Sequence, residues 1–221
     1  MCGIVGIFIK NKKLENNLGS YLSKMIDNMS SRGPDSAGFA IYDSLKNKKH
    51  CKFSLCLSDD ININHFIKDI KKNFKNIKTK QLDDHMVITT SSKIKNFKKF
   101  INDKYKTVSI VGYGHSIEIF KQVGNPRNVV KKFQLHKFRG THGIGHTRMA
   151  TESAITTNGS HPYSTGADEC LVHNGSLSNH NNLRRMLIKN GKTFYSKNDT
   201  EVAAGYISSK LQEKFSLKET L

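Results

Sequence analysis

Cys2 is the first residue whose type and position could do chemistry, because only Met1 precedes it and Gly3 follows it. Methionine aminopeptidases remove Met before small residues, so the sequence predicts a mature chain that begins with Cys2. That residue would carry a thiol, which is a strong nucleophile. It would also carry a free α-amine, whose pKa of roughly 7.7–8.0 allows it to act as a base near neutral pH. The alternative is a small buried cysteine at the start of a strand.

Two later segments place polar groups within or at the end of apolar runs. Arg148 lies inside the run 145–151, where a guanidinium needs an anion. The parallel N–H groups of its guanidinium suit a carboxylate, which could belong to a ligand or to an acidic side chain in a structural salt bridge. The run 171–176 turns at Asn174-Gly175, where a side-chain amide and a backbone N–H could together hold an oxyanion. A lone Asn-Gly is more often an ordinary turn.

Two further segments fit ordinary roles when each is taken alone. The stretch 31–38 indicates the end of a helix, a turn and the start of a strand, with Arg32 able to be buried. Either Asn198 or Asp199, in the stretch 197–202, is placed to cap a helix. Asp199 could also face an ammonium group.

Together and in this order, the segments resemble the class II glutamine amidotransferases. These are the glutaminase domains of amidophosphoribosyltransferase, glucosamine-6-phosphate synthase, asparagine synthetase and glutamate synthase. The matching motifs are Met1-Cys-Gly-Ile-Val-Gly6, Arg32-Gly-Pro-Asp-Ser-Ala-Gly38, Gly145-His-Thr-Arg-Met-Ala-Thr151, His173-Asn-Gly175 and Asn198-Asp-Thr-Glu201. Within this family, residues 152–157 and 173–180 are more similar to the stand-alone glutaminase-like subunits of glutamate-synthase-like systems, including N-methylglutamate synthase.

The resemblance implies a catalytic group around the N-terminus. Cys2 would be the nucleophile and its α-amine the base. Asn174, through its side-chain amide, and Gly175, through its backbone N–H, would form the oxyanion hole. Arg32 would support the strand that carries the nucleophile.

The resemblance also implies a glutamine-binding group. Arg148 would hold the α-carboxylate of glutamine, with Thr151 beside it, and Asp199 would hold the α-ammonium. The sequence departs from the commonest family pattern after Thr151, where Glu152-Ser153 replaces His-Gly or Ala-Gly. That segment belongs to the loop expected to close over glutamine.

The expected reaction is hydrolysis of the glutamine side-chain amide through a Cys2 thioester, with no metal or organic cofactor. A chain of 221 residues has no room for a synthase domain as well. The ammonia is therefore expected to pass to a partner synthase subunit or to a C-terminal extension. The alternative is a regulatory or scaffolding subunit with the same fold and little activity of its own.

The formal net charge is +18, and a strongly basic charge is typical of nucleic-acid-binding proteins. However, only six of the 36 basic residues are Arg, the lysines are dispersed, and no aromatic platform motif accompanies them. We therefore expect no nucleic-acid partner, and a basic RNA-binding protein stays as the alternative from another class. The charge could still attract an acidic protein partner.

Metal, membrane and secretion signals are weak. The four cysteines form no CxxC pair and no zinc-like spacing. His142 and His146 have a metal-like spacing, but Gly143 and Gly145 between them are unsuited to a helix. The sequence contains no secretion signal and no run long enough for a membrane span. We expect a cytoplasmic protein with free thiols and no membrane partner.

These residues must be positioned by an α+β domain, which the resemblance makes a four-layer α/β/β/α sandwich of the N-terminal-nucleophile hydrolase type. A single domain is expected over 1–221, with a Lys/Asn-rich insertion at about 44–138. The pattern predicts buried strands at 2–9, 143–150 and 170–173, a strand at 39–42, and helices at 17–30, 128–133, 182–189 and 199–214. Within the insertion it predicts helices near 62–76 and 93–103, a strand near 86–90, and a hairpin of 108–113 with 117–123.

Overall fold

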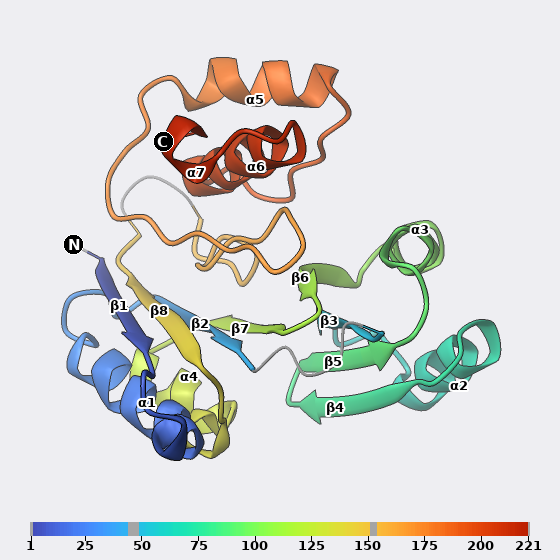
Figure 1. Cartoon of the computed structure of the whole chain (residues 1–221), viewed down its shortest axis with the longest axis horizontal. Coiled ribbons are helices and arrows are strands. Elements are labelled where there is room, and N and C mark those ends of the chain that lie inside the picture. Colours follow the sequence, from blue (N-terminus) through green and yellow to red (C-terminus); the bar gives the residue numbers. More distant parts are fainter. Residues whose placement is uncertain (1, 44–48, 151–153, 221) are drawn as a thin grey trace.

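Two antiparallel sheets form the centre of the molecule (Figure 1). The computed structural model describes residues 2–43, 49–150 and 154–220. In this part of the chain, the first sheet has the strand order β1 (Gly3–Phe8), β8 (His142–Arg148), β2 (Ser36–Tyr42), β7 (Ile117–Val123). The second sheet has the order β4 (Lys78–Leu82), β5 (His85–Thr90), β3 (Cys51–Cys56), β6 (Ser109–Gly114).

Helices cover the outer face of each sheet, which gives the predicted order of four layers, helix, sheet, sheet and helix. The first sheet is covered by α1 (Leu18–Asn28) and α4 (Pro126–Lys132), with short 3-10 turns η1 (Lys12–Asn17) and η2 (Leu135–Lys137). The second is covered by α2 (Ile63–Asn73) and α3 (Ile94–Lys104). Across the described residues, none of the helices is long and apolar enough to cross a membrane.

The first helix layer follows from a regular apolar pattern. In α1, Leu18, Leu22 and Ile26 are spaced four residues apart and are fully buried, as the helical period requires. They pack in one cluster with Phe39 of β2 and Phe120 of β7. The predicted helix and its apolar face are confirmed.

The second sheet and its helices come entirely from the Lys/Asn-rich part of the chain, residues 51–114. The predicted helices near 62–76 and 93–103 and the strand near 86–90 are confirmed as α2, α3 and β5. Strands β3 and β4 were not predicted. The side chains of β4 are almost all exposed, so this strand has no alternating apolar pattern. The segment therefore supplies half of the sandwich.

The predicted hairpin of 108–113 with 117–123 is wrong, because β6 and β7 belong to different sheets. The chain changes sheet at His115-Ser116, where the Asp168 carboxylate accepts hydrogen bonds from three successive backbone N–H groups, those of His115, Ser116 and Ile117, over 2.8–3.1 Å. These bonds satisfy the backbone donors of the connection and of Ile117, the first residue of β7. A distant side chain therefore decides this topology.

Two predicted buried strands also differ from the structure. Strand β1 lies at a sheet edge, and its outer face leaves Ile4 43% and Phe8 68% exposed. Residues 170–173 form no strand; a single bridge between Leu171 and Tyr163 is the only sheet-like pairing of this segment with the described residues. An apolar run forms a strand only when a neighbouring strand can pair with it.

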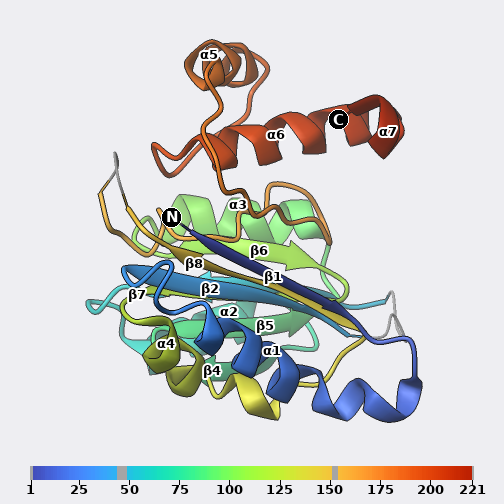
Figure 2. The ribbon, with the colours of Figure 1, turned by 90° about the vertical axis from the view of Figure 1, so that its left-hand side faces the viewer.

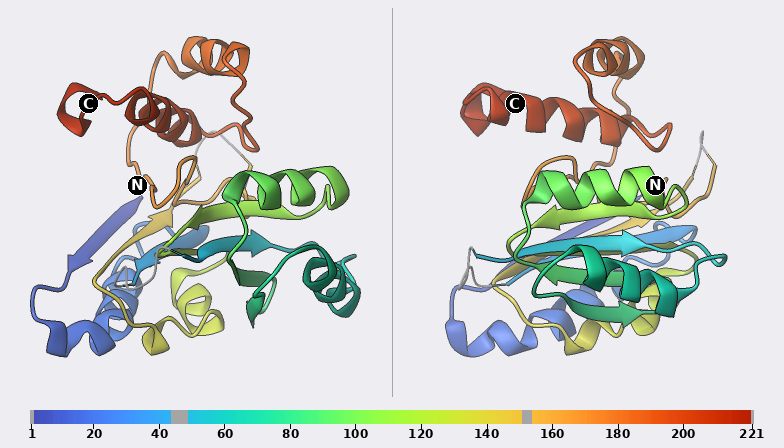
Figure 3. Two further views of the ribbon diagram at one scale, coloured as in Figure 1. Left: turned by 45° about the vertical axis from the view of Figure 1, so that its right-hand side comes forward. Right: turned by 90° about the vertical axis from the view of Figure 1, so that its right-hand side faces the viewer.

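Three C-terminal helices gather over one end of the sheets, close to the N-terminus (Figures 2 and 3). They are α5 (His180–Lys189), α6 (Asp199–Gln212) and the short α7 (Leu217–Thr220). Asn198 caps α6 by accepting a hydrogen bond from the Thr200 N–H over 2.8 Å. The side chain of Asp199 is therefore not needed for the cap and can make other contacts.

Candidate functional site

Cys2 directly precedes β1, and the N-terminus lies at the end of the first sheet nearest the C-terminal helices (Figure 1). Gly3 pairs with Thr147 of β8, and a Cβ at position 3 would come within 2.7 Å of Thr147 Oγ1 and 2.9 Å of Met29 Cβ. Glycine is therefore required for this close pairing. As a result, the half-buried Cys2 lies beside the end of β8, and its thiol donates to the Met149 carbonyl oxygen over 3.8 Å.

The turn 32–35 packs against the same corner. Arg32 Nε donates a hydrogen bond to the Cys2 carbonyl oxygen over 3.4 Å. A Cβ on Gly33 would come within 2.4 Å of the backbone of β8, so the turn can approach this closely only with glycine. The Asp35 carboxylate accepts a bond from the Ala150 N–H over 2.7 Å. Arg32, expected to support the nucleophile strand, thus contacts Cys2 directly.

The turn 173–175 reaches Cys2 from the opposite part of the chain. Asn174 Nδ2 donates to the Cys2 carbonyl oxygen over 3.2 Å, so the amide expected in the oxyanion hole lies against the expected nucleophile. Asn174 and Gly175 are both exposed. The carbonyl of His173, which belongs to the peptide unit leading into Asn174, accepts a bond from His146 Nε2 over 3.0 Å.

Arg148 and Asp199 are each joined to a segment that contacts Cys2. Arg148 is the last residue of β8 and is 4% exposed, and its Nη1 donates to the Ala154 carbonyl over 3.2 Å. Asp199 accepts a bond from the Leu177 N–H over 2.7 Å, which ties α6 to the loop after Asn174. Thr151, expected beside Arg148, lies outside the described residues together with Glu152 and Ser153.

The electrostatics place Arg148 and Asp199 around one region. Burial raises the pKa of Tyr163, with smaller effects from Arg148, which lowers it, and from Asp199, which raises it. The pKa of His146 is lowered to about 4, mainly by burial and to a smaller extent by Arg148. Arg148 and Asp199 therefore both act on Tyr163, and a cation and an anion near one group suit a zwitterionic ligand.

Sequence reasoning missed a set of polar residues behind this corner. His146 and His161 are buried and stack on each other with ring centroids 3.9 Å apart. His161 Nε2 lies 2.9 Å from the Thr200 hydroxyl, and Thr200 is the neighbour of Asp199. The signal that could have found His161 is a histidine before proline in a polar loop, which by itself is weak. His146 lies within the motif 145–151, where it was given no role.

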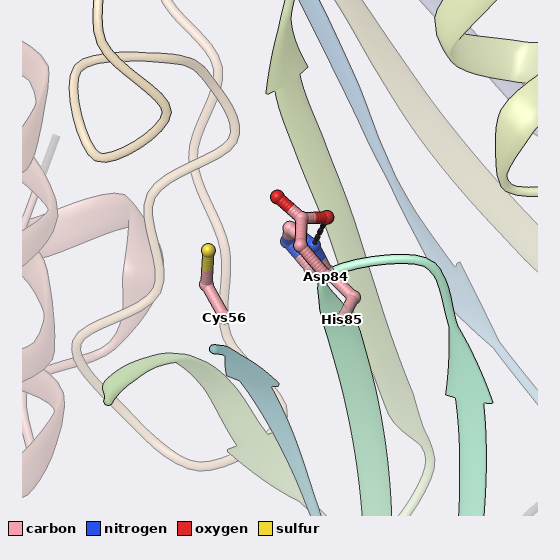
Figure 4. Close-up of side chains that lie close together, drawn as sticks. All are labelled: Cys56, Asp84 and His85. Carbon is pink, nitrogen blue, oxygen red and sulfur yellow. Dashed lines mark hydrogen bonds and ion pairs between the residues drawn. The ribbon is translucent and has the colours of Figure 1, made fainter. Parts of the chain in front are cut away.

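A metal ion could be considered at Cys56, Asp84 and His85, the single such group in the part of the chain that the structure describes (Figure 4). Asp84 Oδ1 lies 2.8 Å from His85 Nδ1, and Asp84 Oδ2 accepts a bond from Gln122 over 2.9 Å. Both carboxylate oxygens are therefore engaged. Burial raises the pKa of the Cys56 thiol to about 12, so it is protonated at neutral pH and is a poor ligand. We assign no metal to this group.

A separate hollow of about 280 Å³ lies between β6 and α6, lined by residues that include Lys98, Lys121 and Glu201. Lys121 is 4% exposed, and its ammonium donates to the carbonyl oxygen of Ser160 over 2.8 Å. Burial lowers the pKa of Lys121 to about 8. None of the described residues that contact Cys2 lines this hollow. Lys121 contacts the loop on both sides of His161, through the carbonyl oxygens of Ser160 and Pro162.

Known proteins match this arrangement in sequence and in fold. A sequence family described as a glutamine amidotransferase domain matches residues 134–211. The chain is 45% identical over 222 residues to the glutamine amidotransferase-like protein GlxB of Rhizobium meliloti (strain 1021), with coverage of 100% of this chain and 74% of that protein. It is 30% identical over 233 residues to a protein of Methanothermobacter thermautotrophicus named provisionally as a glutamine amidotransferase, with coverage of 100% and 76%.

Among solved structures, the fold is similar to one described as the allosteric regulatory enzyme of purine biosynthesis. The TM-score is 0.51 at 18% identity, and the match covers 100% of this chain and 31% of that longer one. At this identity the likeness concerns the fold alone. The 45% identity to GlxB over the whole of this chain, the matching sequence family and the shared fold agree with one another. The chain therefore belongs to the class II glutamine amidotransferases.

Proposed function

We propose that the chain hydrolyses the side-chain amide of glutamine to glutamate and ammonia, with Cys2 as the nucleophile. The observation that carries this proposal is the meeting of three separate segments at Cys2. Arg32 and Asn174 both contact its carbonyl oxygen, and its thiol contacts the residue that follows Arg148. The segments are distant in sequence, and each brings a group with a distinct part in amide hydrolysis.

In the proposed reaction, removal of Met1 leaves Cys2 with a free α-amine. This amine takes the thiol proton, and the sulfur attacks the amide carbon of glutamine. The oxyanion that forms accepts hydrogen bonds from Asn174 Nδ2 and the Gly175 N–H, which contribute roughly 3–4 kcal/mol to lowering the barrier. The carbon–nitrogen bond then breaks, and the protonated α-amine supplies the proton with which ammonia leaves. Water attacks the remaining thioester and releases glutamate.

Arg148 and Asp199 are proposed to hold the substrate. The guanidinium of Arg148 pairs with the α-carboxylate of glutamine in two parallel hydrogen bonds. The carboxylate of Asp199 pairs with the α-ammonium. Thr151 is proposed to assist Arg148. Both charged groups come from rigid elements, the end of β8 and the start of α6, so the substrate is oriented before the attack.

The test is glutamate formation by the purified chain and by Cys2→Ala and Cys2→Ser. Both substitutions remove the thiolate, so both should abolish activity. Cys51→Ala is the matched control, because it removes a buried thiol from the second sheet and should retain activity. Full glutaminase activity in Cys2→Ala would contradict the proposal.

A partner is proposed to receive the ammonia, because the site is open on one side. Arg32, Asn174 and Gly175 are exposed and Cys2 is half-buried, whereas efficient transfer of ammonia requires exclusion of water. A synthase subunit that docks over this corner would close it and raise the rate. A regulatory subunit with little activity is the second candidate, and the same exposure favours it.

Ammonia production should be measured with and without a co-purified partner, at two salt concentrations. The net charge of +18 predicts faster association with an acidic partner at low salt. Equal rates in all conditions, with the partner demonstrably bound, would indicate a free-standing glutaminase. Negligible rates in all conditions would favour the regulatory subunit.

A further inference from the structure

Two buried histidines connect the groups around Cys2 from behind. His146 lies on β8 and is 1% exposed, and His161 lies in the loop after β8 and is 4% exposed. Their rings stack at 22° with centroids 3.9 Å apart. Burial lowers the pKa of both, so both rings are neutral at neutral pH.

The hydrogen bond of His146 fixes its tautomer. A carbonyl oxygen can only accept, so His146 Nε2 carries the proton that it donates to the His173 carbonyl oxygen over 3.0 Å. His146 Nδ1 has no hydrogen-bond partner among the residues that the structure describes, as suits the unprotonated nitrogen of this tautomer. This bond holds the peptide unit that leads into Asn174.

The hydrogen bond of His161 acts on the other half of the site. Its Nε2 lies 2.9 Å from Thr200 Oγ1, and its Nδ1 is likewise without a partner in the described part of the chain. With Nε2 as donor, the Thr200 hydroxyl is free to donate onward, to Asp199 Oδ1 at 3.3 Å or His173 Nδ1 at 3.4 Å. His161 thereby fixes the first turn of α6, which carries Asp199.

His161 itself is held firmly on the first sheet. A Cβ on Gly38 of β2 would come within 2.1 Å of the His161 carbonyl oxygen, so the loop lies directly on the strand. The buried ammonium of Lys121 donates to the neighbouring Ser160 carbonyl over 2.8 Å. The sheet is therefore a rigid reference for the position of His161 and, through Thr200, for Asp199.

We propose that His146 and His161 are two positioning residues with different tasks, His146 holding Asn174 for the reaction and His161 holding Asp199 for recognition of the substrate ammonium. This inference rests on the proposed glutaminase function. It assigns the two stacked rings to separate steps, because one bond leads to the turn 173–175 and the other to α6. A purely structural pair would affect both steps alike.

The experiment compares glutamine with glutaramic acid, which is glutamine without the α-amino group. Kd values for both are measured calorimetrically in the Cys2→Ala background, where no reaction follows. His161→Leu removes the donor and should weaken glutamine binding about tenfold, as expected for the loss of one positioning hydrogen bond. Glutaramic acid, which does not use Asp199, should bind within twofold of the parent. His161→Gln retains an N–H donor and should restore part of the difference.

His146→Leu should leave the ratio of the two Kd values unchanged. In chains that retain Cys2, it should lower kcat for both substrates, whereas His161→Leu should raise KM for glutamine. Thr200→Val keeps the side-chain shape without the hydroxyl and should reproduce His161→Leu, which provides a second test if His161→Leu fails to fold. His85→Gln, in another buried histidine, is the control and should leave the ratio unchanged.

Thermal unfolding midpoints show whether His161→Leu and Thr200→Val are folded. The proposal is overturned if the folded variants bind both ligands equally more weakly, or bind neither more weakly. Failure of the proposed function looks different. In that case the parent Cys2→Ala chain binds glutamine no better than glutaramic acid, and the chain with Cys2 releases no ammonia.

Discussion

Replacement of Arg148 should separate recognition of glutamine from the chemistry at Cys2. The side chain is 4% exposed, so its guanidinium would meet the substrate carboxylate largely out of water. Truncation of one partner of such a pair costs on the order of 2–5 kcal/mol. At about 1.4 kcal/mol per factor of ten, Arg148→Ala should lower kcat/KM for glutamine by roughly 30-fold to several thousand-fold. Arg148→Lys should not restore activity, because one ammonium cannot replace the two parallel bonds of the fork.

Arg148 also donates to the Ala154 carbonyl over 3.2 Å, and loss of that bond costs about 1 kcal/mol of stability. A second substrate separates this structural effect from recognition. The compound 4-aminobutanamide is glutamine without its α-carboxylate, so it makes no use of the guanidinium. Its already low kcat/KM should change less than threefold in Arg148→Ala.

The assay is steady-state ammonia release from both amides at pH 7.5, with Arg127→Ala as the matched control. Arg127 is an exposed arginine paired with Asp27, and its removal should leave both rates unchanged. A kcat/KM for glutamine within threefold of wild type in Arg148→Ala would refute the assignment. Equal losses on the two substrates would show that Arg148 acts only through the fold.

Three further predictions concern stability. Asp168→Asn keeps one acceptor oxygen but loses the charge that holds the turn before β7. Its free energy of unfolding in urea should be lower than that of wild type by about 2–4 kcal/mol. A decrease below about 0.5 kcal/mol would contradict the role of Asp168. Lys121 has a folded pKa of about 8 against an ordinary 10.5, so the unfolded chain binds the Lys121 proton more tightly. The stability of wild type relative to Lys121→Met should therefore rise by about 3 kcal/mol as the pH increases between these two pKa values. An unchanged difference between pH 7.5 and 10.5 would refute it. His146 has a folded pKa of about 4 against an ordinary 6.5, so its contribution to the free energy of unfolding should fall by about 3 kcal/mol as the pH decreases from 6.5 to 4. If the stability of wild type and of His146→Gln fell in parallel with decreasing pH, this prediction would be wrong.

Elements with a strong local pattern could be predicted from the sequence. The four-residue spacing of Leu18, Leu22 and Ile26 defines α1 before any tertiary contact is known. The helix α6 follows equally from Asn198 as a cap. In both cases the information lies within about a turn of the element itself, where periodicity and capping act.

Elements decided by distant contacts could not be predicted. The separation of β6 and β7 into different sheets depends on Asp168, more than 40 residues further along the chain. Residues 170–173 have the composition of a strand, yet their one pairing with the described residues is the bridge from Leu171 to Tyr163. Local composition cannot show whether a partner strand is present.

The candidate site divides in the same way. Cys2, Arg32 and Asn174 were expected together because their motifs resemble a family, and in the structure they are in contact. His161 belongs to none of those motifs, and Thr200 lies within one of them but was given no role there. The importance of both residues follows from hydrogen bonds across the fold. The groups proposed to do chemistry were therefore more predictable than those that position them.

The central claim is that Cys2 at the mature N-terminus forms the covalent bond with the substrate. The most direct measurement is intact-mass and peptide-mapping spectrometry of the chain after reaction with a diazoketone analogue of glutamine. We expect one adduct, on Cys2, in a chain that has lost Met1, with none on Cys51, Cys56 or Cys170. Active chain that retains Met1, or an adduct confined to another cysteine, would contradict the account.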